Sequence, residues 1–578
     1  MGDANVKTVP KAGEDAGSDF NRATNDGFDE GDDIVYGKVV VSRLGTSSSV
    51  HYDSLKDQTA KITMAEWSVQ RAKPVHLCIG SCFRPHFRTI KALKLLRQAC
   101  INRTNWIHKS QYVDASSPER LSVRNPDNDD LVTDQIQVAT QQDVDNAVAA
   151  AKKAFPKWRM TASTTRRNMM LKFADILEAE SEELGRLESI CMGQPMTLAK
   201  AFVQGAVEYW RYYAGFCGKV AGESFPPDED GTYKIVQYEP LGVCAGINAW
   251  NGTHILAAWK MAPALATGNT FVIKASEKSP LALARYGELL TKAGIPAGVV
   301  NIVSGGGAVG AMLASHTDVS KIAFTGSAPA GRAVAVAAAK SNFKKVSLEL
   351  GGKSPALVFD DADLENAVQQ NSVNFLMNSG QVCFAATRVL VQENIAPKFI
   401  EAIKGAFEKA GESMGDPSKS ETVFGPLADQ AQFDRVMGML DDARANGVEY
   451  LTGGIRKGKK GSYVEPTVIL NPDVNAKVFT DEIFGPVIAL KTFKTEEEGI
   501  ALANNTSYGL GSTIFTTDAA RALRVAGQIE AGTVGINSAF TTSTATPFGG
   551  FKQSGYGRES GAAGLKEYLQ PKTIHIKM

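Results

Sequence analysis

The sequence predicts an α/β protein with doubly wound parallel sheets, and three observations support this. The chain of 578 residues is long enough for two or three domains, and 43% hydrophobic with 21% charged residues is typical of a globular protein. From residue 242 onward, short apolar strands alternate with helical stretches. The alternation starts again after residue 352, so we expect a second α/β unit with ligands at the carboxyl ends of the strands.

Charge and cysteine content exclude several classes of protein. The formal net charge is zero, which provides no whole-chain attraction to nucleic acid or to an anionic membrane. No apolar run approaches the ~18 residues of a transmembrane helix, so we expect no membrane insertion. The seven cysteines are odd in number and scattered, which argues against a disulfide framework and favours a reducing, cytoplasmic location.

Residues 1–105 differ in composition from the rest of the chain. Residues 1–37 are polar and acidic, which is typical of disorder, whereas residues 88–100 resemble a basic amphipathic helix for a membrane surface or a partner, or a marginal solvated helix. Two cysteines and two histidines at residues 76–86 lack the tighter spacing of structural zinc sites, and we predict no metal site. The segment is therefore interpreted as a disordered extension or as an error in the predicted coding sequence.

Ordered elements begin near residue 106 with short strands and continue with helices. Thr140 predicts a helix N-cap, supported by Asp143 in the first turn. Apolar residues then follow at helical spacing until Pro156, which we expect to end the helix. Further helices are predicted over residues 168–188 and 197–215.

The alternating region supplies the strands of both units. Strands are expected at residues 242–247, 270–274, 299–303, 321–325, 356–359 and 388–391, with helices at 364–377 and 397–410 among the connections. Ser279 and Pro280 predict the N-cap and first residue of a helix that ends at Gly294. The segments 233–238 and 568–577 read as edge strands that pair with each other or with another subunit.

Two reactive side chains flank the start of the second unit. Glu349 lies on an apolar strand before a double glycine, and desolvation there raises the pKa of a carboxyl toward that of a general base. Cys383 follows a glycine turn, and its thiol needs a base or a cationic cofactor ring to become a thiolate. Read separately, the cysteine also fits a buried core residue and the glutamate an ion pair.

Three loops are candidates for a dinucleotide site, and two of them favour it. Residues 305–310 match G-x-G-x-x-G, but no acid follows at the required distance, so a turn with positive φ is the preferred interpretation. Gly326 and Ser327 open a helix whose free N–H groups suit a pyrophosphate. Lys274 and Glu277 end a strand, where the carboxylate can bind ribose hydroxyls and repel a 2′-phosphate. A plain βα loop and an exposed ion pair remain the alternatives.

Asn251 follows a buried strand in an Ala-Trp-Asn-Gly sequence. Its amide can donate to a developing oxyanion, a contribution of ~10²–10³ in rate, or it can cap the next helix. Residues 481–487 and 547–559 read separately as a charged turn and a glycine-rich loop.

Together these motifs resemble the aldehyde dehydrogenase superfamily, in the expected order over about residues 106–578. The resemblance implies that Cys383 is the nucleophile, Glu349 the general base and Asn251 the oxyanion donor, with Lys260 and Glu559 forming a secondary proton path. It assigns cofactor binding to Trp250, Lys274, Glu277, Gly326, Ser327, Glu482 and Phe484. It assigns Phe548 to the substrate tunnel, and the residues that suggest a roomy apolar tunnel with it are Gly252, Trp259, Phe384 and Phe540. Gly252 stands where the family often carries an aromatic residue, which enlarges the tunnel.

The resemblance also implies an arrangement of domains. A Rossmann-like NAD-binding domain covers residues 106–232 and 242–351, and a catalytic domain covers residues 352–555. A small β element, residues 233–241 and 556–578, mediates oligomerisation as a homodimer or homotetramer.

The implied reaction is the NAD-dependent oxidation of an aldehyde to a carboxylic acid through a thiohemiacetal and a thioester on Cys383. NAD is favoured over NADP because of Glu277. The alternatives are a CoA-acylating dehydrogenase or an acyl reductase of the same fold, and a catalytically silent structural or binding protein. Glu349 favours hydrolysis over transfer to coenzyme A. The tunnel residues suggest an aromatic or medium-chain aldehyde, without identifying it.

Overall fold

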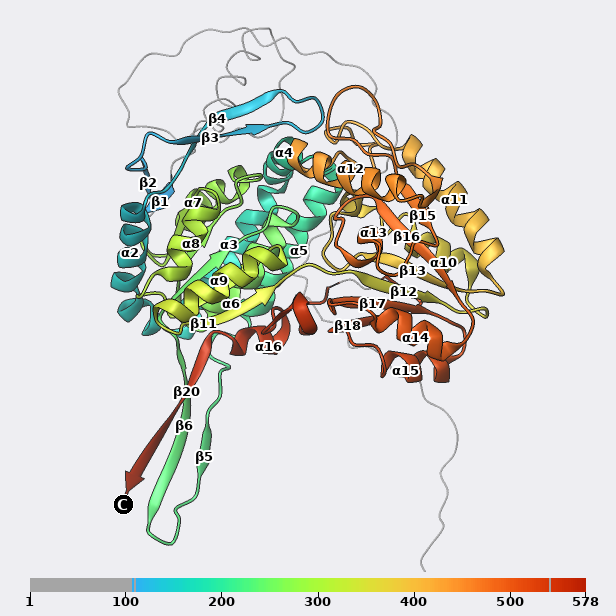
Figure 1. The fold of residues 1–578 in the computed structure, drawn as a ribbon. Coiled ribbons are helices and arrows are strands. Elements are labelled where there is room, and N and C mark those ends of the chain that lie inside the picture. Colours follow the sequence, from blue (N-terminus) through green and yellow to red (C-terminus); the bar gives the residue numbers. More distant parts are fainter. Residues whose placement is uncertain (1–105, 109–110, 540–541) are drawn as a thin grey trace, which may run out of the picture. The chain divides into compact units, whose positions relative to one another are not determined.

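A computed structural model describes residues 106–108, 111–539 and 542–578 of the chain (Figure 1). Contacts divide the chain after residue 83, and every described residue belongs to the second unit. The expectations for residues 1–105, including the amphipathic helix and the cysteine–histidine cluster, lie outside the described residues, as does Phe540. Among the residues described, none of the helices has the length and apolarity needed to cross a membrane.

The first sheet has eight strands in the order β19-β11-β10-β7-β8-β9-β1-β2. Its strands are β1 (Trp106–His108), β2 (Gln111–Val113), β7 (Val243–Ile247), β8 (Thr270–Lys274), β9 (Val300–Val303), β10 (Lys321–Thr325), β11 (Lys345–Glu349) and β19 (Gly555–Tyr556). The five central strands are parallel. Among the parallel strands the chain starts at β7, proceeds outward to β9 and then returns to β10 on the other side of β7, which creates a topological switch point.

Helices cover both faces of the first sheet. They are α2 (Gln141–Arg159), α3 (Ser163–Ala179), α4 (Ser181–Met192), α5 (Met196–Ala214), α6 (Thr253–Ala266), α7 (Leu281–Ala293), α8 (Gly307–Ser315) and α9 (Ala328–Ser341). On β7, Cys244 faces the core formed with α3, α5, α6 and α7, whereas Val243 and Ala245 face the core formed with α2, α8 and α9. This alternation confirms the predicted doubly wound fold.

Helix α2 shows one correct and one wrong prediction. Thr140 and Asp143 form a complete capping box, as expected. Pro156, however, does not end the helix, which continues to Arg159. A proline removes the hydrogen bond made by its own nitrogen, but it leaves its carbonyl and the following residues free to finish the last turn.

Three other helix predictions are also wrong in detail. The stretch 168–188 is two helices, α3 and α4, which meet at Glu180. Ser279 does not cap α7, because its hydroxyl donates instead to the Glu188 carboxyl at 2.6 Å, and Pro280 occupies the N-cap. The helix predicted over 364–377 ends at Asn371.

The second sheet has seven strands in the order β14-β15-β16-β13-β12-β17-β18, and only β14 is antiparallel. Its strands are β12 (Ser354–Val358), β13 (Ala386–Gln392), β14 (Glu449–Thr452), β15 (Thr467–Leu470), β16 (Val487–Phe493), β17 (Gly511–Phe515) and β18 (Thr533–Ile536). Its helices are α10 (Leu364–Asn371), η1 (Met377–Gly380), α11 (Ala396–Glu412), α12 (Gln430–Ala445), α13 (Lys477–Thr480), α14 (Glu496–Asn504) and α15 (Ala519–Ala526). The α10–α11 pair and the α14–α15 pair pack on opposite faces. The switch point of this sheet lies between β12 and β17.

The remaining strands form two smaller sheets. They are β3 (Arg120–Arg124) with β4 (Leu131–Gln137), and β5 (Glu223–Phe225), β6 (Thr232–Pro240) and β20 (Leu569–Lys577). The tail strand β20 pairs with β6 along its whole length, from Leu569 opposite Pro240 to Lys577 opposite Thr232, so the predicted pairing within the chain is confirmed. We call β5, β6 and β20 the ribbon; it extends from the first sheet (Figure 1).

The C-terminal loop returns to the first sheet before the ribbon. Segment η2 (Lys552–Ser554) leads into β19, which pairs with β11 so that Gly555 lies opposite Glu349. Helix α16 (Gly561–Lys566) follows. This return brings the 547–559 loop next to the end of β11.

Candidate active site

Glu349 and Cys383 lie where the two sheets meet. Glu349 is the last residue of β11, in the first sheet, and the chain crosses from it to β12 in the second sheet. Cys383 lies in the turn between η1 and β13. The Glu349 carboxylate is near enough to raise the pKa of the Cys383 thiol, so the fold brings these two predicted residues together.

The double glycine between the sheets allows this close approach. A Cβ atom on Gly352 would lie 2.4 Å from the carbonyl oxygen of Cys383, and one on Gly351 would lie 2.1 Å from Oε2 of Glu482. Side-chain carbon atoms do not approach a backbone carbonyl so closely, so space rather than φ requires glycine at 352, whereas at 351 the end of the Glu482 side chain would have to move.

The turn before Cys383 contains three consecutive left-handed residues. Their φ angles are 55° at Asn378, 55° at Ser379 and 71° at Gly380. A left-handed conformation costs roughly 1–2 kcal/mol at a residue other than glycine. Contacts on the far side hold the turn: Ser379 Oγ donates to the Gly425 carbonyl at 2.6 Å, and a Cβ on Gly380 would lie 2.2 Å from the Gly485 carbonyl oxygen.

Asn251 lies between β7 and α6, beside the nucleophile turn. Its Nδ2 atom donates to the carbonyl oxygen of Gln381 at 3.1 Å. A primary amide has two N–H donors, so this bond orients the group and leaves the second N–H for another acceptor.

The Glu349 side chain is buried and only 4% exposed. Burial raises the pKa of its carboxyl well above the ordinary value, and the nearby Glu559 carboxylate raises it further, while Lys260 and Arg558 oppose the shift. Within the described part of the chain its Oε2 atom has no hydrogen-bond partner. A carboxyl with a raised pKa and a free oxygen is suited to accept a proton from water.

Cys383 is partly exposed in a setting that disfavours its thiolate. Burial of the sulfur raises the pKa of the thiol, and the carboxylates of Glu482 and Glu349 raise it further. The thiol therefore needs a base, or a cationic ring beside it, before it can act as a nucleophile.

Lys260 and Glu559 form a buried ion pair next to Glu349. Lys260 Nζ lies 2.8 Å from Glu559 Oε1 and donates to Thr325 Oγ1 at 2.5 Å. Glu559 is held by two backbone hydrogen bonds with Phe548, of 2.7 and 2.8 Å. The pair thus connects α6, β10 and the C-terminal loop behind the end of β11.

A cavity of about 400 Å³ lies at the switch point of the first sheet. Its lining includes the predicted cofactor residues Trp250, Lys274, Glu277, Gly326 and Ser327. The Ser327 side chain makes no capping bond to α9, so the first N–H groups of that helix have no side-chain cap. Such N–H groups next to a cavity suit a phosphate group.

Lys274 is buried between Glu277 and the glycine loop. Its Nζ atom donates to Glu277 Oε2 at 3.2 Å and to the Gly305 carbonyl at 2.6 Å. Burial lowers the pKa of Lys274, while the Glu277 carboxylate opposes that shift. Gly305 has a φ of 143°, which confirms the interpretation of this loop as a turn with positive φ.

Glu482 and Phe484 lie in the loop between α13 and β16, next to the double glycine. Glu482 Oε1 accepts the Gly352 N–H at 3.1 Å, and burial raises the pKa of this carboxyl to about 7. The Phe484 ring lies edge-on to Trp250, with centroids 5.3 Å apart. Phe484 therefore lies next to the predicted cofactor residue Trp250, and Glu482 lies next to the double glycine that follows Glu349.

Aromatic side chains line the space beside the nucleophile turn. Phe548 lies 5.0 Å from Trp259 and 5.7 Å from Phe384, measured between ring centroids. A Cβ on Gly252 would meet Leu256 and Phe202 only at 3.7 Å, which is ordinary van der Waals contact. The position could therefore carry a side chain, and glycine leaves that space unfilled.

Sequence reasoning missed two kinds of residue at this site. Arg435 on α12 donates to the carbonyl oxygen of Glu482 at 2.6 Å and thereby holds the loop that carries it. Asn378 and Gln194 form buried amide contacts behind Asn251. The sequence Asn-Ser-Gly-Gln before Cys383 was a signal for an unusual turn, but no pattern indicated their partners.

Comparison with known proteins gives one consistent result. The profile of the aldehyde dehydrogenase family matches residues 112–574. An aldehyde dehydrogenase of Emericella nidulans is 41% identical over 471 residues, which cover 81% of this chain and 94% of that protein. PnpE from Pseudomonas sp. WBC-3, solved in complex with nicotinamide adenine dinucleotide, is 41% identical with a TM-score of 0.79 over 82% of this chain and 97% of that one. An NADP-dependent enzyme of E. coli is 34% identical with a TM-score of 0.80 over 83% and 99%.

Proposed function

The chain belongs to the aldehyde dehydrogenase family, whose members oxidise aldehydes with NAD or NADP, and we propose that Cys383, Asn251 and Glu349 carry out this reaction here. One arrangement supports the proposal: a partly exposed thiol lies between an oriented amide and a buried carboxyl with a free oxygen. Each residue type fits one step of acyl chemistry.

In the first step the Cys383 sulfur bonds to the aldehyde carbon. The thiol gives up its proton to solvent, a step that a cationic cofactor ring beside it would favour, while the carbonyl π electrons move to oxygen. The second N–H of Asn251 and the backbone N–H of Cys383 bind the resulting oxyanion. Bound NAD supplies the hydride acceptor that oxidises this adduct to a thioester on Cys383.

In the second step the thioester is hydrolysed. Glu349 takes a proton from water, and the oxygen of that water bonds to the acyl carbon. The carbon–sulfur bond then breaks, which releases the carboxylic acid and restores the Cys383 thiolate. The Lys260–Glu559 ion pair beside Glu349 provides a secondary path along which the proton leaves.

The cavity of the first sheet fits a dinucleotide. Lys274 and Glu277 would bind the adenosine ribose, and Gly326 with Ser327 would bind the pyrophosphate at the N-terminus of α9. Glu482 would bind the nicotinamide ribose, with Phe484 and Trp250 packed beside it. The Glu277 carboxylate would repel a 2′-phosphate, which favours NAD over NADP.

The substrate is proposed to be an aromatic or medium-chain aldehyde. Trp259, Phe384 and Phe548 supply an apolar wall, and Gly252 leaves room beside it. A ring or an alkyl chain buries apolar area there, at roughly 25 cal/mol per Å².

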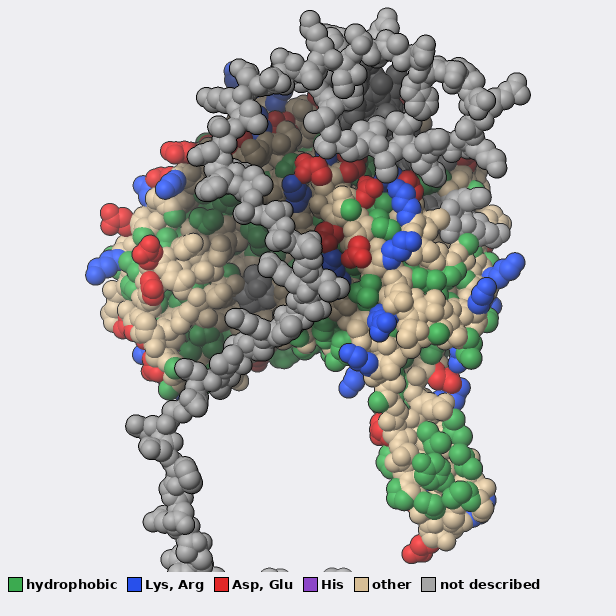
Figure 2. Space-filling model, turned by 180° about the vertical axis from the view of Figure 1, so that it is seen from behind, with side chains coloured by type: hydrophobic (Ala, Val, Ile, Leu, Met, Phe, Trp, Pro, Cys, Tyr) green, Lys and Arg blue, Asp and Glu red, His purple; other side chains and the backbone are tan. Residues whose placement is uncertain are grey.

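The arrangement of domains and the assembly complete the proposal. We assign residues 106–232 and 242–351 to NAD binding and residues 352–555 to catalysis. We propose that residues 233–241 and 556–578, which carry most of β6 and all of β20 in the ribbon, mediate assembly into a homodimer or homotetramer. Figure 2 shows apolar side chains gathered on the ribbon, where Phe225, Tyr238 and Ile576 are 45%, 37% and 39% exposed. Such a patch on a sheet suits a second copy of the chain. The free thiols of Cys191, Cys217, Cys244 and Cys383 support a reducing compartment, which we propose to be the cytoplasm.

The test is NADH formation from a panel of aromatic and aliphatic aldehydes, with and without coenzyme A. We expect turnover without coenzyme A, and a loss of at least ~10⁴-fold in Cys383→Ala, because the covalent step disappears. Cys217→Ala changes a free thiol away from the site and is the matched control. Unchanged turnover in Cys383→Ala would refute the mechanism, and acceleration by coenzyme A would favour acyl transfer.

A further inference from the structure

Asn378 forms the centre of a buried amide cluster that touches both sides of the proposed oxyanion site. Its Nδ2 atom donates to the carbonyl oxygens of Asn251, at 3.0 Å, and of Gln381, at 3.2 Å. Its Oδ1 atom accepts from Gln194 Nε2 at 3.2 Å. Asn378 and Gln194 are 2% and 1% exposed, so water cannot readily replace these bonds, and losing one of them would leave a buried polar group without a partner.

The Gln381 carbonyl is the point where the two sides meet. It accepts from Asn378 Nδ2 and also from Asn251 Nδ2, at 3.1 Å. The Asn378 side chain therefore donates to the backbone carbonyl of Asn251, and the side chains of both asparagines donate to the Gln381 carbonyl. Two hydrogen bonds therefore join the loop after β7 to the turn before Cys383, and a third, within the turn, closes the triangle.

Gln194 determines which way the Asn378 amide faces. With its Oδ1 atom bonded to Gln194 Nε2, Asn378 presents its N–H donors to the two carbonyl groups. A flipped amide would place an oxygen against both carbonyls and a donor against the donor of Gln194. Gln194 is held in the short loop between α4 and α5.

We propose that Asn378 is a positioning residue for the oxyanion site, and that Gln194 orients it. The inference rests on the proposed roles of Asn251 and Cys383, because it concerns the separation of their two N–H donors. The left-handed backbone of the turn is one that asparagine tolerates and most residues do not. The amide cluster holds this costly turn at one distance from Asn251.

The main variant is Asn378→Gly, which keeps the left-handed backbone accessible and removes the amide without adding charge. We expect kcat for aldehyde oxidation to fall by ~10–10²-fold, because a displacement of about 1 Å at a catalytic group costs up to 10²-fold. The KM for NAD should stay within about threefold, because the cofactor cavity is not touched.

A second readout separates positioning from collapse of the turn. Alkylation of Cys383 by iodoacetamide forms no oxyanion, so its rate in Asn378→Gly, followed by mass spectrometry of the Cys383 peptide, should stay within about threefold of the wild type. If alkylation and kcat fall together, the turn itself is lost and the inference is wrong.

Two further variants keep the test decisive. Asn378→Asp tolerates the same backbone and still accepts from Gln194, but it opposes both carbonyls, and we expect an equal or larger loss of kcat. Asn301→Ala removes a buried amide on β9 that donates to the Gly298 carbonyl at 2.9 Å; it should lower the melting temperature and leave kcat near that of the wild type.

Asn251→Ala separates this inference from the proposed function. If Asn251→Ala loses kcat and Asn378→Gly does not, the oxyanion role holds and the positioning role of Asn378 is refuted. If neither variant loses kcat, the oxyanion assignment fails and the inference fails with it.

Discussion

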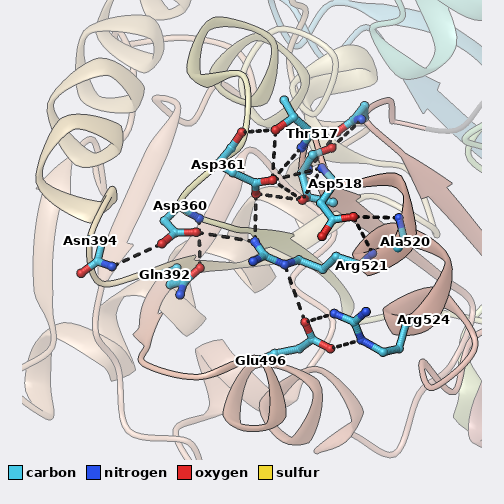
Figure 3. Close-up of polar contacts among 12 residues, drawn as sticks. Asp360, Asp361, Gln392, Asn394, Glu496, Thr517, Asp518, Ala520, Arg521 and Arg524 are labelled. Carbon is cyan, nitrogen blue, oxygen red and sulfur yellow. Dashed lines mark hydrogen bonds and ion pairs between the residues drawn. The ribbon is translucent and has the colours of Figure 1, made fainter.

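The two sheets share a doubly wound topology but use their switch points differently. Between β7 and β10 the first sheet opens a cavity of about 400 Å³ lined by Lys274, Glu277 and Ser327. Between β12 and β17 the second sheet places a dense polar network at the corresponding position (Figure 3). Parallel topology produces a crevice at both positions, and the side chains decide which one stays open.

The network of the second sheet is centred on Asp361 and Arg521. The Asp361 carboxylate accepts from Thr516 Oγ1 at 2.8 Å and from the backbone N–H of Thr517 at 3.1 Å. Arg521 Nη1 lies 3.0 Å from Asp361 and 3.5 Å from Asp360, and its guanidinium lies over the Phe359 ring. These bonds fasten α15 to the segment that follows β12, at the position that the cavity takes in the first sheet.

The second unit presents its reactive group at the opposite edge instead. Cys383 precedes β13, and the double glycine precedes β12, so both lie at the amino ends of their strands. Glu349 lies at the carboxyl end of β11 in the first sheet. The proposed chemistry therefore takes place where the carboxyl edge of one sheet meets the amino edge of the other.

The largest difference in turnover is expected between two variants that each remove one carboxylate, Glu349→Gln where the two sheets meet and Asp361→Asn at the switch point of the second sheet. Loss of the base should lower steady-state turnover by ~10²–10⁴-fold while leaving an initial burst of about one NADH per active site, because the thioester still forms. Asp361→Asn removes a charge of the same kind from the closed switch point and should cost about 1–3 kcal/mol of stability with little change in kcat. Stopped-flow NADH absorbance and thermal unfolding measure the two effects.

The pH dependence provides a second check on Glu349. The pKa of its carboxyl is raised, so at low pH the group is protonated and cannot act as a base. As pH rises through that raised pKa the carboxylate forms, and kcat should rise with it. Glu349→Gln should lose this rise. A pH profile that is the same in wild type and variant would contradict the assignment.

A smaller effect is expected from two glycine substitutions. They compare the packing at the meeting edges, where the carboxyl edge of the first sheet faces the amino edge of the second, with the packing at the loop before α8 in the first sheet. In Gly352→Ala the new Cβ would lie 2.4 Å from the Cys383 carbonyl oxygen, so the nucleophile turn must move, and kcat should fall ~10–10²-fold. Gly306 precedes α8 with a φ of −83° and has no atom within 4 Å of an added Cβ. Gly306→Ala should keep kcat within about threefold, measured with the same aldehyde. Equal losses in both would show that the meeting edges are no more tightly packed than the first sheet.

Much of the fold could be predicted because burial leaves a clear pattern. The strands at 270–274 and 321–325 were predicted with their observed bounds, since every residue in them is buried and apolar positions are continuous. Pro156 was misread because a proline removes the hydrogen bond of its own nitrogen but does not stop the three residues after it from completing the helix. Ser279 was misread because its hydroxyl donates to a distant carboxyl, that of Glu188.

The site was predictable only where a residue has chemistry of its own. Glu349 and Cys383 are reactive groups within short motifs, and the structure brings them together. Asn378 and Arg435 donate hydrogen bonds to backbone carbonyl groups that are distant in the chain. Because every residue has a backbone carbonyl, the sequence gives no sign of which one is the partner. A cavity lies at the carboxyl ends of the first sheet, where the sequence predicts ligands, whereas the Asp361–Arg521 ion pair lies at the corresponding ends of the second; only side-chain packing makes this difference.

The smallest effect concerns the open switch point itself. Glu277→Gln keeps the shape of the side chain that faces Lys274 but removes the charge proposed to bind ribose hydroxyls and to repel a 2′-phosphate. The Glu277 side chain is 47% exposed, so solvent weakens its interactions, and we expect the KM for NAD to rise only ~3–10-fold with kcat nearly unchanged. The ratio of kcat/KM for NAD to that for NADP should narrow about tenfold, measured by NADPH and NADH formation. Glu288→Gln, which loses its ion pair with Arg285 on α7 outside the cavity, is the control. A large loss of kcat in Glu277→Gln would mean that the open crevice takes part in the chemistry, and the contrast between the cofactor-binding switch point and the reactive meeting edges would then be wrong.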